Sequence, residues 1–118
     1  MAGATDTTYS ADSSDSTLKG GEGSDNNLTI SAGIFPNVEY VYGGGSTDTA
    51  ANDNKVTIKN LTGKVIYVYG GFATAEAKNN TVNLLMNNLQ ISSNLAGGGG
   101  ITVISGNTLN IAAKNITT

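Results

Sequence analysis

The sequence predicts an all-β fold, a parallel β-helix (β-solenoid) with about 27 residues in each rung, or turn of the coil. Two kinds of residue recur and set this period. Asparagines that lie two residues before an apolar–polar–apolar triplet recur at steps of 28, 26 and 27 residues: Asn26, Asn54, Asn80 and Asn107. Glycine pairs recur at steps of 27 residues: Gly43 and Gly44, Gly70 and Gly71, Gly97 and Gly98. A period of this length is typical of stacked repeat proteins.

The composition of the 118-residue chain also favours strands and tight turns. Thr and Val fit the pleated sheet, while the abundant Gly and Asn tolerate turn geometry. No stretch has apolar residues at helical spacing. The length allows one domain with a modest core.

The first 25 residues differ from the rest. Asp6, Asp12 and Asp15 lie among Ser, Thr and Gly with few apolar neighbours. Such a segment buries too little surface to offset the entropy lost on ordering. We therefore expect residues 1–25 to be a polar, partly disordered or degenerate cap segment, and residues 26–118 to carry the repeat array.

In each unit the first strand follows the asparagine. Strand neighbours point to opposite faces, so the outer residues of each triplet share a face. The residues predicted to face the core are Leu28 and Ile30, Val56 and Ile58, Val82 and Leu84, and Leu109 and Ile111. Parallel stacking of the units would place Val56 beside both Leu28 and Val82.

A second strand follows over residues 38–42, 65–69 and 92–96, and it leads to a glycine pair that we expect to form a sharp turn with positive φ. Val41, Val68 and Leu95 share a position that is apolar in all three units, so we expect them inside. This places four tyrosines outside: Tyr40, Tyr42, Tyr67 and Tyr69. A polar connector then leads to the next asparagine, except that residues 101–104 alternate like a strand.

The recurring asparagines predict a ladder. Parallel strands stack at about 4.8 Å, so equivalent side chains of successive rungs meet. A stacked asparagine amide can bond to the amides above and below it. We therefore expect the side chains of Asn26, Asn54, Asn80 and Asn107 to satisfy the polar groups of the turns.

The chain resembles a known group of proteins. Tyr-Val-Tyr-Gly-Gly at residues 40–44 and 67–71, with Asp-Asn-Lys-Val-Thr-Ile at 53–58 and Asn-Asn-Thr-Val at 79–82, is similar to the repeats of bacterial autotransporter passenger domains and related surface adhesins. The resemblance covers roughly residues 26–111 and implies a right-handed parallel β-helix (β-solenoid). It also implies the bacterial cell surface, outer membrane-anchored or secreted. The chain is far shorter than a whole passenger, so a fragment is expected.

Charge and composition argue against several classes of function. The net charge is −3 and arginine is absent, so the chain lacks the positive field that binding to nucleic-acid phosphates requires. No apolar run of about 18 residues predicts a transmembrane helix. Without cysteine, disulfides and thiol chemistry are absent, which fits passengers that cross membranes unfolded. No cofactor is predicted.

Neither catalysis nor a metal site is predicted. The sequence has no histidine, the commonest general base, and no acid recurs at a fixed position on a strand face. Residues 20–25 match the opening of a calcium-binding nonapeptide, but Asn27 stands where that motif needs an aliphatic residue, and no tandem copy follows. No helix follows the glycine runs, as a phosphate-binding loop would need.

We therefore expect a non-catalytic structural segment of a bacterial surface or secreted adhesin, the stalk of an autotransporter passenger. A carbohydrate-binding or carbohydrate-active β-helix module is the second hypothesis. End-to-end self-assembly of a repeat fragment through exposed rung edges is the third. The expected partners are accordingly a protein or glycan on a host or neighbouring cell, and other copies of the chain.

The candidate binding surface is the set of outward tyrosines, Tyr40, Tyr42, Tyr67 and Tyr69, because aromatic side chains stack on sugars and anchor protein contacts. Their alternative role is to stiffen the sheet by stacking on each other. Glycosylation stays open as a modification, because four Asn-X-Thr sequons occur: at Asn27, Asn60, Asn79 and Asn115.

Overall fold

The computed structural model describes residues 5–46, 50–86, 89–100, 103–111 and 116–117. These residues form β-strands and no helix, and the strands pair in parallel throughout the sheets. The predicted all-β class and the parallel pairing of successive units are therefore confirmed.

The first large sheet contains the strands that begin each unit. Its strands, in their order across the sheet, are β1 (Thr5–Tyr9), β3 (Asn26–Ile30), β5 (Lys55–Ile58), β8 (Thr81–Leu84) and β11 (Thr108–Ile111). The register sets Val56 opposite Leu28 on one side and opposite Val82 on the other, as the repeat spacing predicts.

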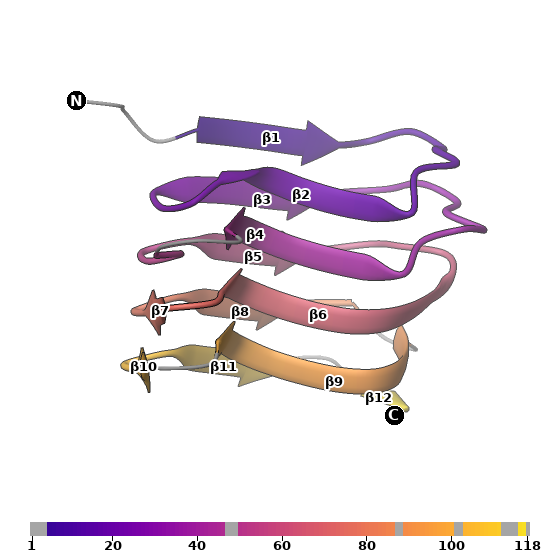
Figure 1. Ribbon diagram of the computed structural model, residues 1–118. Coiled ribbons are helices and arrows are strands. Elements are labelled where there is room, and N and C mark those ends of the chain that lie inside the picture. The colour runs from indigo at the N-terminus through magenta and orange to yellow at the C-terminus, as the bar shows by residue number, and fades with distance from the viewer. Residues whose placement is uncertain (1–4, 47–49, 87–88, 101–102, 112–115, 118) are drawn as a thin grey trace.

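The second large sheet contains the strands that follow. In order across the sheet they are β12 (Ile116–Thr117), β9 (Leu89–Gly100), β6 (Lys64–Ala73), β4 (Tyr40–Ser46) and β2 (Thr17–Glu22). Each unit contributes one strand to each large sheet, and Figure 1 shows the units lying one above another from the N-terminal strand β1 downward.

A small third sheet pairs β7 (Glu76–Lys78) with β10 (Val103–Ser105). The strand expected over residues 101–104 is therefore present in part, while residues 101 and 102 lie outside the described residues. The polar stretch that holds Glu76 was expected to be a connector and is a strand instead. Its pairing with β10 shows that this side of the stack also has in-register backbone hydrogen bonds.

The core lies between the two large sheets and is mainly aliphatic. The triplet residues predicted to face inward in β3, β5 and β8 are fully buried: Leu28, Ile30, Val56, Ile58, Val82 and Leu84. Val41 and Val68 of the second sheet are fully buried too, and Leu95 and Leu109 pack against this cluster. The inward positions are therefore confirmed, apart from Ile111, whose side chain lies outside the described ones.

One large core residue does not belong to the repeat pattern. Phe35, in the segment between β3 and β4, is fully buried and meets Tyr9 edge to face, with ring centroids 6.2 Å apart. Its backbone N–H donates to the carbonyl of Thr62 in the next unit (2.8 Å). An aromatic ring therefore fills the interior where the chain passes from the first sheet to the second.

The first two strands extend both large sheets beyond the array predicted from residue 26. Thr5–Tyr9 pairs with β3, and Thr17–Glu22 pairs with β4 so that Leu18 lies opposite Val41. Leu18 is fully buried. The described part of residues 1–25 is thus a unit of the same stack, with Thr5 where later units have asparagine.

The glycine pairs are not turns, which corrects the sequence prediction. Gly43 and Gly44, Gly70 and Gly71, and Gly97 and Gly98 all lie inside β4, β6 and β9, and none has a positive φ. A Cβ at Gly43 would lie 2.6 Å from the carbonyl oxygen of Gly70, in the adjacent strand. Glycine is needed here because the backbone of the adjacent strand approaches closely, not because the glycine itself has an unusual backbone conformation.

The sharp turns lie one residue before each recurring asparagine. The residues at this position have left-handed backbones: Asp25 (φ 62°), Asp53 (φ 57°), Asn79 (φ 55°) and Gly106 (φ 65°). Asp, Asn and Gly are the residue types that adopt this conformation at least cost. The sequence carried this signal, since the residue before each asparagine is always one of these three types.

Candidate functional site

The four recurring asparagines form a continuous hydrogen-bonded column, here called the asparagine ladder. Asn54 donates both its backbone N–H (3.0 Å) and its side-chain Nδ2 (2.9 Å) to Oδ1 of Asn80. The same two bonds, each 2.9 Å long, join Asn26 to Asn54 and Asn80 to Asn107. Each amide thus bonds to the next unit as the sequence predicts.

The remaining Nδ2 hydrogen of each ladder residue goes to a backbone carbonyl of the turn. Asn54 donates to Gly23 (2.9 Å) and Asn80 donates to Ala51 (2.8 Å). Asn54 and Asn80 are only 1% and 0% exposed, so these polar side chains lie in the interior with their amide groups bonded. Buried amides cost little when they are paired, and the ladder is therefore a structural element.

The glycine pairs and the ladder fit together. A Cβ at Gly44 would lie 2.5 Å from Oδ1 of Asn54, and a Cβ at Gly71 would lie 2.5 Å from Oδ1 of Asn80. The second glycine of each pair therefore leaves the space that an asparagine amide fills. This close contact explains why the glycine pairs and the ladder asparagines recur with the same period in the sequence.

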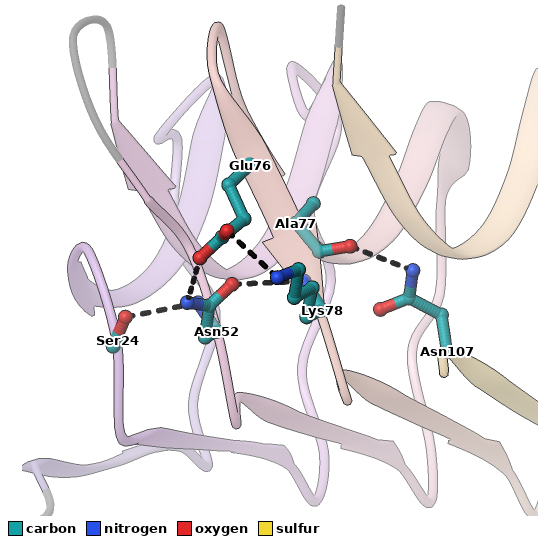
Figure 2. Close-up of polar contacts among 6 residues, drawn as sticks. All are labelled: Ser24, Asn52, Glu76, Ala77, Lys78 and Asn107. Carbon is teal, nitrogen blue, oxygen red and sulfur yellow. Dashed lines mark hydrogen bonds and ion pairs between the residues drawn. The ribbon is translucent and has the colours of Figure 1, made fainter. Parts of the chain in front are cut away.

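A second polar network, not predicted from the sequence, lies on the outer side of the same turns (Figure 2). The centre of this network is Asn52. Its backbone N–H donates to Oγ of Ser24 (2.9 Å), and its Nδ2 donates to Oε2 of Glu76 (2.7 Å). Its Oδ1 accepts the backbone N–H of Lys78 (2.9 Å), and Lys78 Nζ lies 2.9 Å from Oε1 of Glu76.

These contacts change the acidity of one carboxyl. The hydrogen bond from Asn52, and after it the bond from Lys78, hold the pKa of Glu76 below its ordinary value of 4.5. Ser24, Asn52 and Lys78 each lie two residues before a ladder asparagine, and that fixed offset is the signal by which the sequence could have identified them. The three hydrogen bonds of Asn52 join different units, while the Glu76–Lys78 ion pair lies within β7. The bonds of Asn52 indicate a role in holding the units together.

The candidate tyrosines come together on the outer face of β4 and β6. Tyr40 and Tyr67 are opposite each other in the register, and their rings are parallel within 7° with centroids 5.1 Å apart. Tyr42 and Tyr69 form the neighbouring column, 6.1 Å from Tyr40 and Tyr67 respectively. All four side chains are half-buried, which places them on the surface as expected.

Phe72 completes this surface and was not predicted. Its ring centroid lies 5.1 Å from that of Tyr69, and its side chain is 38% exposed. The five rings line a groove of about 320 Å³, here called the aromatic groove. Burial, opposed by the nearby charge of Lys19, raises the pKa of Tyr42 above its ordinary value of 10.0, so its hydroxyl stays protonated at neutral pH.

The other sequence candidates are not gathered into a site. Gly20 and Gly21 of the calcium-like motif lie within β2, and Asp25 is exposed at its turn. In the part of the chain that the structure describes, no three acidic side chains group closely enough to hold a metal ion. Among the sequons, Asn60 and Asn79 are exposed and Asn27 is half-buried, while Asn115 lies outside the described residues.

Comparison with known proteins found no match to this chain among family models, curated proteins or solved structures. The described residues also include no helix that is long and apolar enough to cross a membrane. The ladder, the outer polar network and the aromatic groove are the features of this chain that bear on its function.

Proposed function

We propose that this chain is a right-handed parallel β-helix that serves as a non-catalytic structural segment, or stalk, of a bacterial surface or secreted adhesin of the autotransporter passenger type. The observation that carries the proposal is the asparagine ladder. It joins four successive units through the same pair of hydrogen bonds, so these four units make the same contacts with one another.

The distribution of polar groups supports a structural role. The buried polar side chains Asn26, Asn54 and Asn80 bond within the fold and present no reactive group to a substrate. The outer network of Asn52, Glu76 and Lys78 likewise bonds between units. A stack held in this way has the stiffness that a stalk requires.

The cellular part of the proposal is tested on intact cells of the bacterium that carries the gene. Antibodies raised against the chain should label unpermeabilised cells, and proteinase K added outside should remove the label. Labelling that depends on permeabilisation would contradict a surface location.

The aromatic groove supports a second candidate, a carbohydrate-binding module, and one substitution separates the two. For a stalk, the protein should show no selective binding on a glycan array, and Tyr67→Ala should lower stability by about 1 kcal/mol because a stacked ring is lost. Selective glycan binding that disappears in Tyr67→Ala with unchanged melting temperature would favour the binding module instead.

The partners we propose for the stalk are a protein or glycan of a host or neighbouring cell, and other copies of the chain that pair with the outer strands of the large sheets. Self-association is measured by sedimentation velocity over a range of protein concentrations. A monomer at every concentration would remove other copies from this set and leave the stalk proposal in place.

A further inference from the structure

The aromatic groove is lined by tyrosine rings that stack on one another. Tyr40 and Tyr67 have parallel rings with centroids 5.1 Å apart. Two coplanar rings would overlap at that distance, so these rings must lie face to face with an offset. One face of each ring is covered by the other ring, and the parts that this stacking leaves uncovered line the groove.

Glycine neighbours create the space beside these rings. The register sets Phe72 between Gly45 of β4 and Gly99 of β9. A Cβ at Gly99 would lie 2.8 Å from Cε1 of Tyr69 and 2.9 Å from Cδ2 of Phe72, and a Cβ at Gly45 would lie 3.1 Å from Cε2 of Tyr42. The rings lie over positions without side chains, and a larger residue at Gly99 would require them to shift.

The chemistry of the lining is uniform. All five lining residues are aromatic and uncharged, and the groove volume of about 320 Å³ is at the lower end of the range for small-molecule sites. Aromatic rings attract cations through the negative charge of their faces, and they attract other flat rings through stacked or edge-to-face contacts. The chain as a whole has a net charge of −3, which favours a cation over an anion.

From these observations we propose that the aromatic groove is a binding site for a flat, conjugated aromatic cation that lies along the tyrosine columns. It contacts the rings of Tyr40, Tyr42, Tyr67 and Tyr69, and its end contacts Phe72. A sugar ring fits this lining less well, because the five lining residues include no charged or amide side chain to orient the sugar hydroxyl groups. The proposal does not rest on the stalk function, since a stalk could carry this site or lack it.

The test is a fluorescence titration with thioflavin T, a flat aromatic cation whose emission rises when its internal rotation is restricted. The protein should give a saturable rise with one dye per chain, and sedimentation velocity should show that the dye travels with soluble protein. Phe72→Ala and Tyr67→Ala should each weaken the affinity by roughly 3- to 10-fold, the effect of one lost aromatic contact.

Tyr9→Phe is the matched control, because Tyr9 packs against Phe35 away from the groove. The affinity of this variant for thioflavin T should be unchanged. Phe72 is partly exposed, so its variant keeps the test valid if Tyr67→Ala does not fold. In the unmodified protein, dye addition should shift the NMR ring signals of the five lining residues and leave that of Tyr9 in place. The absence of saturable binding, a signal confined to aggregates, or ring shifts outside the groove would overturn the proposal.

Discussion

The asparagine ladder and the aromatic groove are both built from equivalent residues of successive units, but they differ in extent and in burial. The ladder joins four units, and Asn26, Asn54 and Asn80 are at most 3% exposed. The tyrosine columns occupy only β4 and β6 and are half-buried. An interior ladder asparagine bonds to an asparagine in the unit on each side, whereas a stacked ring needs only one partner ring. Repetition in every unit therefore marks the fold, and repetition confined to two units marks a local surface.

The largest effect is expected from a break inside the ladder. Asn80→Ala removes the acceptor of two donors of Asn54 and leaves the carbonyl of Ala51 without its bond. Because these groups are buried, the free energy of unfolding should fall by about 2–3 kcal/mol. Asn26→Ala, at the outer end of the ladder, should cost about 1 kcal/mol. Urea denaturation followed by circular dichroism measures both, and equal losses would refute the ladder's dependence on neighbours on both sides.

Two glycine substitutions, one beside the ladder and one beside the aromatic groove, compare the two regions directly. Gly71→Ala places a methyl group 2.5 Å from Oδ1 of Asn80 and 2.7 Å from the carbonyl oxygen of Ala51, so the ladder must shift. We expect a loss of about 2 kcal/mol. Gly45→Ala meets only the ring edge of Tyr42 at 3.1 Å, and the ring can rotate, so it should cost less than about 1 kcal/mol. Similar melting temperatures for the two variants would mean that the ladder tolerates displacement.

These comparisons show which parts of the fold the sequence could predict. The parallel register and the inward positions of Val56 and Val82 follow from period and alternation, because equivalent residues must meet in a parallel stack. The role of the glycine pairs could not be read in the same way. A missing Cβ permits both a positive φ and a close approach, and only the neighbouring strand decides between them.

The candidate site was predictable to a similar extent. The tyrosines could be assigned to the surface because Val41 and Val68 alternate with them. Phe72 was missed because its neighbours in the register, Gly45 and Gly99, carry no side chain, so no repeat marks its column. Phe35 was missed for a related reason, since it lies between strands, where the repeat spacing gives no face.

A smaller effect on stability is expected at the left-handed turns that precede the ladder asparagines. Asp53 has a φ of 57°, a conformation that a β-branched residue adopts only at a cost. Asp53→Val should therefore be less stable by about 1–2 kcal/mol than Asp53→Gly, which carries the same change in charge and accepts this backbone. Thermal unfolding of the two variants measures the difference. If they melt together, the left-handed turn is not required for placing Asn54.

The smallest effect is expected from the outer polar network and depends on pH. The pKa of Glu76 is held below 4.5 by the hydrogen bond from Asn52 and then by Lys78, so the folded state favours the ionised carboxylate. A lowered folded pKa gives a stabilisation that is fully present above the pKa of the unfolded chain and is lost as the pH falls through the folded pKa. Wild type should therefore be more stable than Glu76→Gln at pH 7, and the difference should disappear as the pH falls through the lowered pKa of Glu76. The difference should also shrink in high salt, because the Glu76–Lys78 pair is partly exposed. Asn52→Ala removes the main hydrogen-bond donor to Glu76, so the pKa of the Glu76 carboxyl, followed by NMR, should move back toward its ordinary value in this variant. A Glu76 carboxyl that titrates at 4.5 or above in the unmodified protein would show that the network does not hold its charge.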